Sequence, residues 1–104
     1  MAITNFQVTA NTASAAFTAS ADTAVTVIYI TNKSSSDGNV NVYVVPSADS
    51  VSENFKIYNN LLIPATDTYI LDTEKLILEN GDKIYIEAPD SAAQFNATIS
   101  TIGL

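Results

Sequence analysis

The sequence predicts an all-β protein, a single antiparallel β-sandwich of about eight strands with jelly-roll or immunoglobulin-like topology. Apolar and polar residues alternate with a period of two through almost the whole chain, and Thr, Val, Ile and Tyr are abundant, as is typical of strands. Turn-forming residues recur every ~8–12 residues, which is the spacing of strands in a sandwich. The 104 residues suffice for one hydrophobic core, so we expect one domain over residues 1–104.

The N-terminal half is expected to form strands at residues 4–10, 15–19, 23–31 and 39–45. Over 23–31 both alternating sets of side chains are apolar or β-branched, which predicts a central strand covered on both faces. A turn follows in which Gly38 is expected to have positive φ. Pro46 cannot donate a backbone hydrogen bond, so it is expected to end the next strand.

The C-terminal half begins with a polar loop, residues 47–54. Further strands are expected at 55–60, 61–67, 68–72, 75–79, 83–88 and 93–104. The stretch 72–80 has weak helix signals, but its neighbours favour a strand. In the last strand Phe95, Ala97 and Ile99 are predicted to face the core, and the polar residues between them to face water.

Residues 76–88, Leu-Ile-Leu-Glu-Asn-Gly-Asp-Lys-Ile-Tyr-Ile-Glu-Ala, predict two short strands joined by an acidic turn. If the strands pair with Leu78 opposite Ile84, aliphatic side chains meet on one face and Glu79 meets Lys83 on the other. That register needs a three-residue or bulged connection. The segment is therefore predicted to be a β-hairpin.

The turn itself has a structural and a functional interpretation. In the structural one Gly81 has positive φ and Asp82 accepts hydrogen bonds from backbone amides. In the functional one Glu79, Asp82 and Asp72 converge as a catalytic carboxylate pair or a calcium site. Converging carboxylates are costly without a bound cation, so we predict that Gly81 and Asp82 form a structural turn.

The composition argues against several classes of function. The chain has no Cys, His or Arg, which removes disulfides, thiolate zinc sites and Ser-His-Asp triads. Its net charge of −7 opposes contact with nucleic acids and anionic lipids. The first residues lack the features of a signal peptide, and no apolar run approaches the ~20 residues of a membrane helix. We expect synthesis in the cytoplasm, no enzymatic activity, no cofactor or metal, and no nucleic-acid or membrane partner.

Two features predict contact with another protein. Strand 23–31 is apolar on both sides and the chain ends in Thr-Ile-Gly-Leu, which together exceed what one small core covers. A sandwich also has open edges that must be capped or paired. We expect a partner protein or a homo-oligomer, with a closed trimer as one arrangement. The alternative is a compact monomer.

Five tyrosines could form an aromatic platform for a sugar, although Tyr is also an ordinary half-buried strand residue. Three of them have polar neighbours and are the better candidates. The residues predicted to take part in interactions are Ile28, Ile30, Tyr43, Tyr58, Tyr85, Ile102 and Leu104.

Residues 55–104 resemble small virion proteins of tailed bacteriophages, especially cyanophage-like ones. The resemblance is carried by the corner Leu-Ile-Leu-Glu-Asn-Gly-Asp-Lys-Ile at 76–84 and by the short apolar end Ile-Gly-Leu at 102–104. It implies a location in the virion, a head decoration (cement) or a neck or tail accessory role, and the major capsid protein or other virion proteins as partners. It implies no catalytic residue.

The hypothesis from sequence is therefore a non-enzymatic capsid decoration protein that binds the outer shell and stabilises it. Each copy would contribute a modest interface, and repetition over the shell would supply avidity. The alternatives are a carbohydrate- or receptor-binding sandwich and a neck or tail accessory protein.

Overall fold

The protein is described here by a computed structural model that covers residues 2–8, 13–72, 76–89 and 94–104. Within these ranges the chain forms nine β-strands and one short 3-10 helix, so the predicted all-β class is confirmed. The elements are β1 (Ala2–Val8), β2 (Ser14–Thr18), β3 (Thr23–Asn32), β4 (Gly38–Val45), η1 (Glu53–Phe55), β5 (Lys56–Ile63), β6 (Thr68–Leu71), β7 (Leu76–Leu78), β8 (Lys83–Glu87) and β9 (Phe95–Gly103). No helix in the described ranges has the length and apolar character needed to cross a membrane. Parts of three expected strands, at 9–10, 75 and 93, lie outside the described residues.

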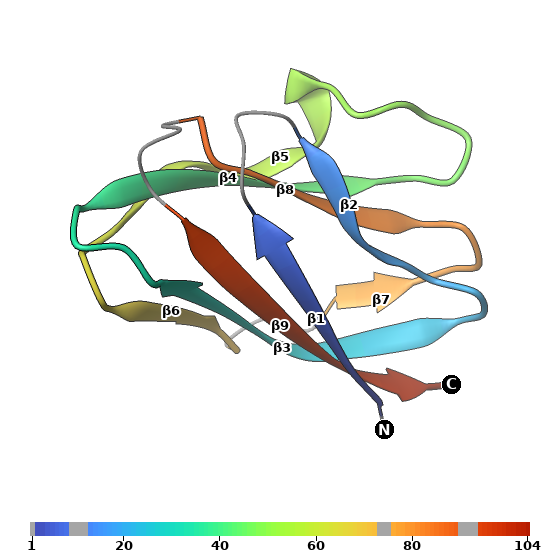
Figure 1. The fold of residues 1–104 in the computed structure, drawn as a ribbon. Coiled ribbons are helices and arrows are strands. Elements are labelled where there is room, and N and C mark those ends of the chain that lie inside the picture. The colour runs from blue at the N-terminus through green and yellow to red at the C-terminus, as the bar shows by residue number, and fades with distance from the viewer. Residues whose placement is uncertain (1, 9–12, 73–75, 90–93) are drawn as a thin grey trace.

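The strands form two antiparallel sheets that pack face to face, as Figure 1 shows. Sheet A has the order β1-β9-β3-β6, and β7 also pairs with β3; sheet B has the order β2-β8-β4-β5. The pairing is nested, with β1 on β9, β2 on β8, β3 on β6 and β7, and β4 on β5. A long antiparallel hairpin rolled into two sheets in this way is a jelly roll, so the fold has that topology and not the immunoglobulin-like one.

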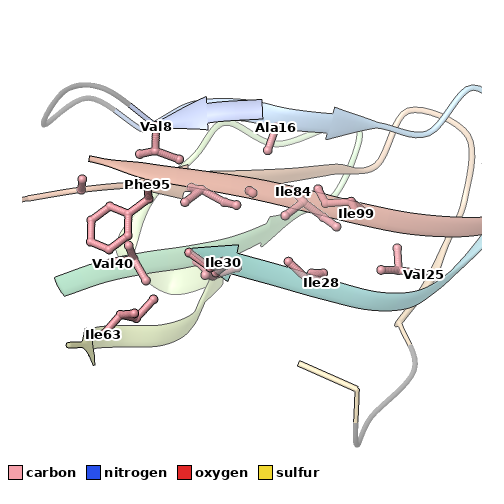
Figure 2. Packing of buried hydrophobic residues seen from close by; sticks show 14 of the residues in the cluster. Val8, Ala16, Val25, Ile28, Ile30, Val40, Ile63, Ile84, Phe95 and Ile99 are labelled. Atoms are coloured by element: carbon pink, nitrogen blue, oxygen red, sulfur yellow. The ribbon is translucent and has the colours of Figure 1, made fainter. Parts of the chain in front are cut away.

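The core lies between the sheets and receives side chains from both. Figure 2 shows Ile28, Ile30 and Phe95 from sheet A packing with Val40 and Ile84 from sheet B. The predicted inward positions of the last strand are confirmed, because Phe95, Ala97 and Ile99 are fully buried. Full burial of each such large side chain contributes roughly 1.5–3 kcal/mol.

A β-bulge decides which side of β3 faces the core. The register with β9 shifts between Val25 and Val27, so the inward set changes from odd to even residue numbers and continues with Ile28 and Ile30. These two isoleucines are buried, which corrects their prediction as interaction residues. The other side of β3 is not covered as predicted, since Tyr29 there is 40% exposed. The alternation in the sequence could not predict which of the two sets of β3 side chains faces the core, because both sets are apolar.

The predicted hairpin over 76–88 is wrong. β7 pairs with β3 in sheet A, whereas β8 pairs with β2 and β4 in sheet B, so the turn takes the chain from one sheet to the other. Leu78 and Ile84 are both buried, but they enter the core from different sheets. Lys83 lies opposite Val45 and not opposite Glu79. The alternation of apolar and polar residues predicts which side chains point inward, but it does not predict which strand is the hydrogen-bonded neighbour.

Three smaller expectations have mixed outcomes. Pro46 follows the last residue of β4, as predicted. Gly38 is the first residue of β4 and is not among the positive-φ residues, which corrects that expectation. The strands expected at 55–60 and 61–67 form one continuous strand, β5, in which Asn60 takes φ 53° at a bulge. Asn tolerates that conformation better than most residues.

Candidate interaction surface

Charged residues are absent from every strand of sheet A. The bounds of β1, β3, β6, β7 and β9 contain no Asp, Glu or Lys, although the chain has a net charge of −7. Sheet B has charged residues in β5 and β8. Sheet A therefore presents an uncharged outer surface on a strongly acidic protein.

Strand register gives the order of side chains across this surface, because directly opposed residues point to the same face of a sheet. The rows on the outer face are Ile77–Ala24–Ile102, then Val27–Ser100–Ile3, then Ile70–Tyr29–Thr98–Asn5, and last Thr68–Thr31–Asn96–Gln7. The first three rows contain the large apolar side chains, and the last is entirely polar. The outer face thus has an apolar part and an amide- and hydroxyl-rich part.

We define the apolar face as Ile3, Tyr29, Ile70, Ile77 and Ile102, which are 40–66% exposed. Leu104, which follows β9, is 71% exposed beside it. Among the described residues only two further large hydrophobic side chains, Ile57 and Leu62, are exposed, and both lie on β5. Exposed apolar side chains are therefore concentrated on one sheet, as they are at protein contact sites.

The size of this surface indicates how tightly it could bind. Burying the exposed half of a large aliphatic side chain contributes about 1 kcal/mol, so the apolar face offers on the order of 5 kcal/mol. Association costs roughly 4–15 kcal/mol in lost freedom of motion. One copy would therefore bind weakly, and stable attachment would need several copies acting together.

The polar part of the same face contains a shallow depression of about 240 Å³. It is lined by Asn5, Phe6, Gln7, Asn96 and Thr98 from β1 and β9. The Thr98 hydroxyl and the Asn5 side-chain oxygen are 2.8 Å apart in a hydrogen bond. Amides and hydroxyls both donate and accept, so the lining suits an uncharged, hydroxyl-rich group.

The outer face of sheet B has a different construction, because its polar groups bond to one another. One oxygen of the Glu87 carboxylate accepts hydrogen bonds from the Asn41 amide at 2.8 Å and from the Tyr43 hydroxyl at 2.7 Å. The Asn41 side-chain oxygen accepts from the backbone N–H of Asn60 at 2.8 Å, which satisfies the bulge in β5. Burial, and then the bonded Glu87 carboxylate, raise the pKa of Tyr43 to about 12.

The connection between β4 and β5 lies against this cluster. η1 contacts β4, and the Lys56 ammonium sits 5.6 Å from the centre of the Tyr43 ring while pairing with Glu53 at 2.6 Å. The start of the connection is fixed by Asp82, whose carboxylate accepts from the Ser47 backbone N–H at 3.0 Å. The connection between β4 and β5 therefore covers this part of the outer face of sheet B.

The predicted tyrosine candidates do not come together. Tyr43 is 5% exposed, so its ring is closed to a ligand. Tyr58 packs edge-on against Tyr69, 5.9 Å between ring centres, beside the core. Burial, with Tyr69 next to it, raises the pKa of Tyr58. Tyr85 is half-buried opposite Tyr43. These rings do not form a flat platform.

The remaining predicted interaction residues, Ile102 and Leu104, are exposed on or beside the apolar face. Sequence reasoning missed Ile3, Ile70 and Ile77. The strands that carry them lack charge, but the ranges expected from sequence, 68–72 and 75–79, include Asp72, Lys75 and Glu79. The signal therefore required the strand bounds and the sheet order, because a single exposed isoleucine on one strand is common.

The acidic corner is built as a structural turn, as predicted. Gly81 has φ 91°, and Asp82 accepts from the backbone N–H of Glu79 at 2.9 Å as well as from that of Ser47. Among the described residues no three acidic side chains come close enough to hold a metal ion. Asp82 uses its carboxylate oxygens to fix two segments of backbone.

A comparison with models of protein families finds none that matches the chain. A comparison with curated protein sequences finds no significant match. The resemblance of residues 55–104 to phage virion proteins therefore stays a prediction.

Proposed function

We propose that this protein is a non-enzymatic structural protein of a phage virion, a decoration (cement) protein that binds the outer shell and stabilises it. The observation that carries the proposal is the apolar face of an uncharged sheet on an otherwise acidic protein. Exposure of such a surface to water is unfavourable, so covering it lowers the free energy, and its strands have no charge to desolvate. Its natural occupant is another protein surface.

The mechanism is adhesive. The apolar face lies against the shell, and the acidic loops remain in water and keep the particle soluble. The contribution of each copy is small, because the cost of association offsets most of the free energy gained by burying the apolar face. Repetition over the lattice makes the total large. A protein that binds the assembled shell and not its separate subunits stabilises the shell by mass action. The major capsid protein is the proposed partner, and a neck or tail surface would use the same face.

A carbohydrate-binding role is the second candidate, and one observation favours it. The depression over β1 and β9 is lined by amide and hydroxyl groups, and Tyr29, which is 40% exposed, lies directly opposite Thr98 at its side. An aromatic ring beside convergent amides is a common way to hold a sugar. This candidate uses Tyr29 in place of Tyr43, Tyr58 and Tyr85.

The test of the proposed function is the copy number of the chain in purified particles of the phage that encodes it, measured by quantitative mass spectrometry against the major capsid protein. A number comparable with that of the capsid protein is expected for a decoration protein. A small number relative to the capsid would assign it to the neck or tail. Complete absence from the particle would overturn the virion proposal and favour glycan binding at the depression.

A further inference from the structure

The sandwich has four open edges, and they differ in how well they are protected against pairing with another chain. An edge strand presents unpaired backbone N–H and C=O groups, which proteins block with charges, bulges, prolines or very short strands. The edges are β1 on one side of sheet A and β6 with β7 on the other, and β2 and β5 on the two sides of sheet B.

Three of these edges carry such protection. β5 has two register shifts, a residue at positive φ and a charged first residue, and Pro64 follows its end. β2 has five residues and a register shift between Ala15 and Phe17. The edge opposite β1 is split between β6, with four residues, and β7, with three. None of them offers a long, regular row of backbone groups.

β1 has none of this protection. It has seven residues, pairs with β9 in unbroken register over its whole length, and contains no charge and no proline. Among the described strands β1 pairs with β9 alone, and Figure 1 shows it at the margin of sheet A. Its neighbour β9 is also uncharged, so another strand could approach this edge without meeting a like charge.

We propose that β1 pairs antiparallel with β1 of a second copy, so that two molecules form a two-fold dimer with sheet A continuous across the interface. Asn5 is the midpoint of β1, so a two-fold axis there overlaps all seven residues of the strand. Ile3 then lies opposite Gln7 of the second copy and Thr4 opposite Phe6, so outward residues meet outward ones and inward residues meet inward ones. Two chains that each carry −7 can approach here because the acidic residues lie elsewhere.

The protection of the other edges favours a dimer over the predicted trimer. A closed ring uses two different, complementary surfaces on each copy, whereas a two-fold dimer uses one surface twice. β1 is the single unprotected edge among the described strands, and a single self-complementary edge gives a two-fold arrangement. The dimer also places two apolar faces on the same side of one extended sheet, which would give a bivalent surface.

The experiment is the molar mass of the purified full chain in solution, measured by analytical ultracentrifugation over a range of concentrations and without any shell. Wild type is expected at twice the 11.0 kDa of the chain. Asn5→Lys places two ammonium groups face to face at the axis and is expected to give a monomer. Asn96→Lys is the matched control, because Asn96 has the same chemistry on the same outer face but lies on β9, and it is expected to stay dimeric.

Two outcomes would overturn the proposal: a monomeric wild type at all concentrations, or a dimer that survives Asn5→Lys. A dimer that Ile77→Glu dissociates and Asn5→Lys does not would assign the interface to the apolar face and so would also reject pairing through β1. Circular dichroism checks that each variant is folded. If Asn5→Lys does not fold, Gln7→Lys and the concentration dependence of amide exchange in β1 give the same decision. Since no shell is present, the result is independent of the proposed virion function.

Discussion

The outer faces of the two sheets differ in whether their side chains are covered by the rest of the chain. On sheet B, polar groups and a tyrosine are enclosed by the chain's own hydrogen bonds and by the connection between β4 and β5. On sheet A, five large apolar side chains stay open and no charge is present on the strands. The polar groups of sheet B are paired within the molecule, whereas the apolar side chains of sheet A are open to water. Substitutions in the bonded cluster of sheet B should therefore affect stability, and substitutions on the apolar face of sheet A should affect association.

The largest expected effect is at the turn that anchors the connection closing sheet B. Gly81 has φ 91°, and a Cβ there would lie 2.7 Å from the Cβ of Ser47. Gly81→Ala should lower the free energy of unfolding by about 2–4 kcal/mol, from backbone strain together with the clash. Gly103→Ala is the control, since a Cβ there meets nothing within 4 Å, and it should change stability little. Urea denaturation measures both; equal effects would show that the turn is not the anchor.

The second-largest loss of stability is expected at Asn41, on the outer face of sheet B. Asn41 is 4% exposed and joins Glu87 to the Asn60 backbone, so Asn41→Ala leaves buried polar groups without partners. We expect a loss of about 2 kcal/mol. Asn96→Ala on the outer face of sheet A should stay within about 0.5 kcal/mol of wild type in the same urea titration. Similar losses in the free energy of unfolding for both variants would contradict this difference between the two outer faces.

A smaller effect concerns pH. The pKa of Tyr43 is about 12 in the folded protein, above its value of about 10 in an unfolded chain. Between these values the folded state keeps a phenol proton that the unfolded state has released, so the stability contributed by the neutral phenol is complete below pH ~10 and lost as the pH rises to ~12. Phenolate absorbance should show Tyr43 among the last tyrosines to ionise. Glu87→Gln should lower this pKa without restoring the ordinary value, because burial is its main cause; an unchanged titration would contradict the bonded cluster.

The smallest effect on stability is expected on the apolar face. Ile77 is 63% exposed, so Ile77→Glu should change the free energy of unfolding by no more than about 0.5 kcal/mol. Leu62→Glu on β5, where Leu62 is 57% exposed, is the matched variant on sheet B and should behave alike. A large loss in the free energy of unfolding for Ile77→Glu, measured by thermal or urea unfolding, would mean that this side chain contributes to the stability of the fold. It would then not be an exposed residue available only for contact with a partner.

The sequence was sufficient for the fold class, for the inward residues of β9 and for the turn at Gly81 and Asp82. Each depends on local information: a period of two, or a residue type that suits one backbone conformation. The partner of β7 was not predictable in this way, because Leu78 can enter the core equally well from a hairpin or from the opposite sheet. Pairing between distant strands is a property of the whole chain.

The candidate surface was only partly predictable for the same reason. Ile102 and Leu104 were identified because they end the chain, whereas Ile28 and Ile30 were assigned to the surface when a bulge turns them inward. Ile3 is more than 60 residues from Ile70 and Ile77 in the sequence, and the three side chains gather only because β1 pairs with β9 whereas β6 and β7 pair with β3. The cluster at Glu87 was missed because its partners on β4 are about 45 positions away.

Binding through the apolar face can be tested by cosedimentation of the purified protein with phage shells that lack it, comparing Ile77→Glu with Leu62→Glu. Both variants exchange an exposed aliphatic side chain for the same carboxylate, one on each sheet. We expect wild type and Leu62→Glu to bind the shell and Ile77→Glu not to bind it. Binding by Ile77→Glu together with failure of Leu62→Glu would place the contact on sheet B and would reject the proposed role of the apolar face.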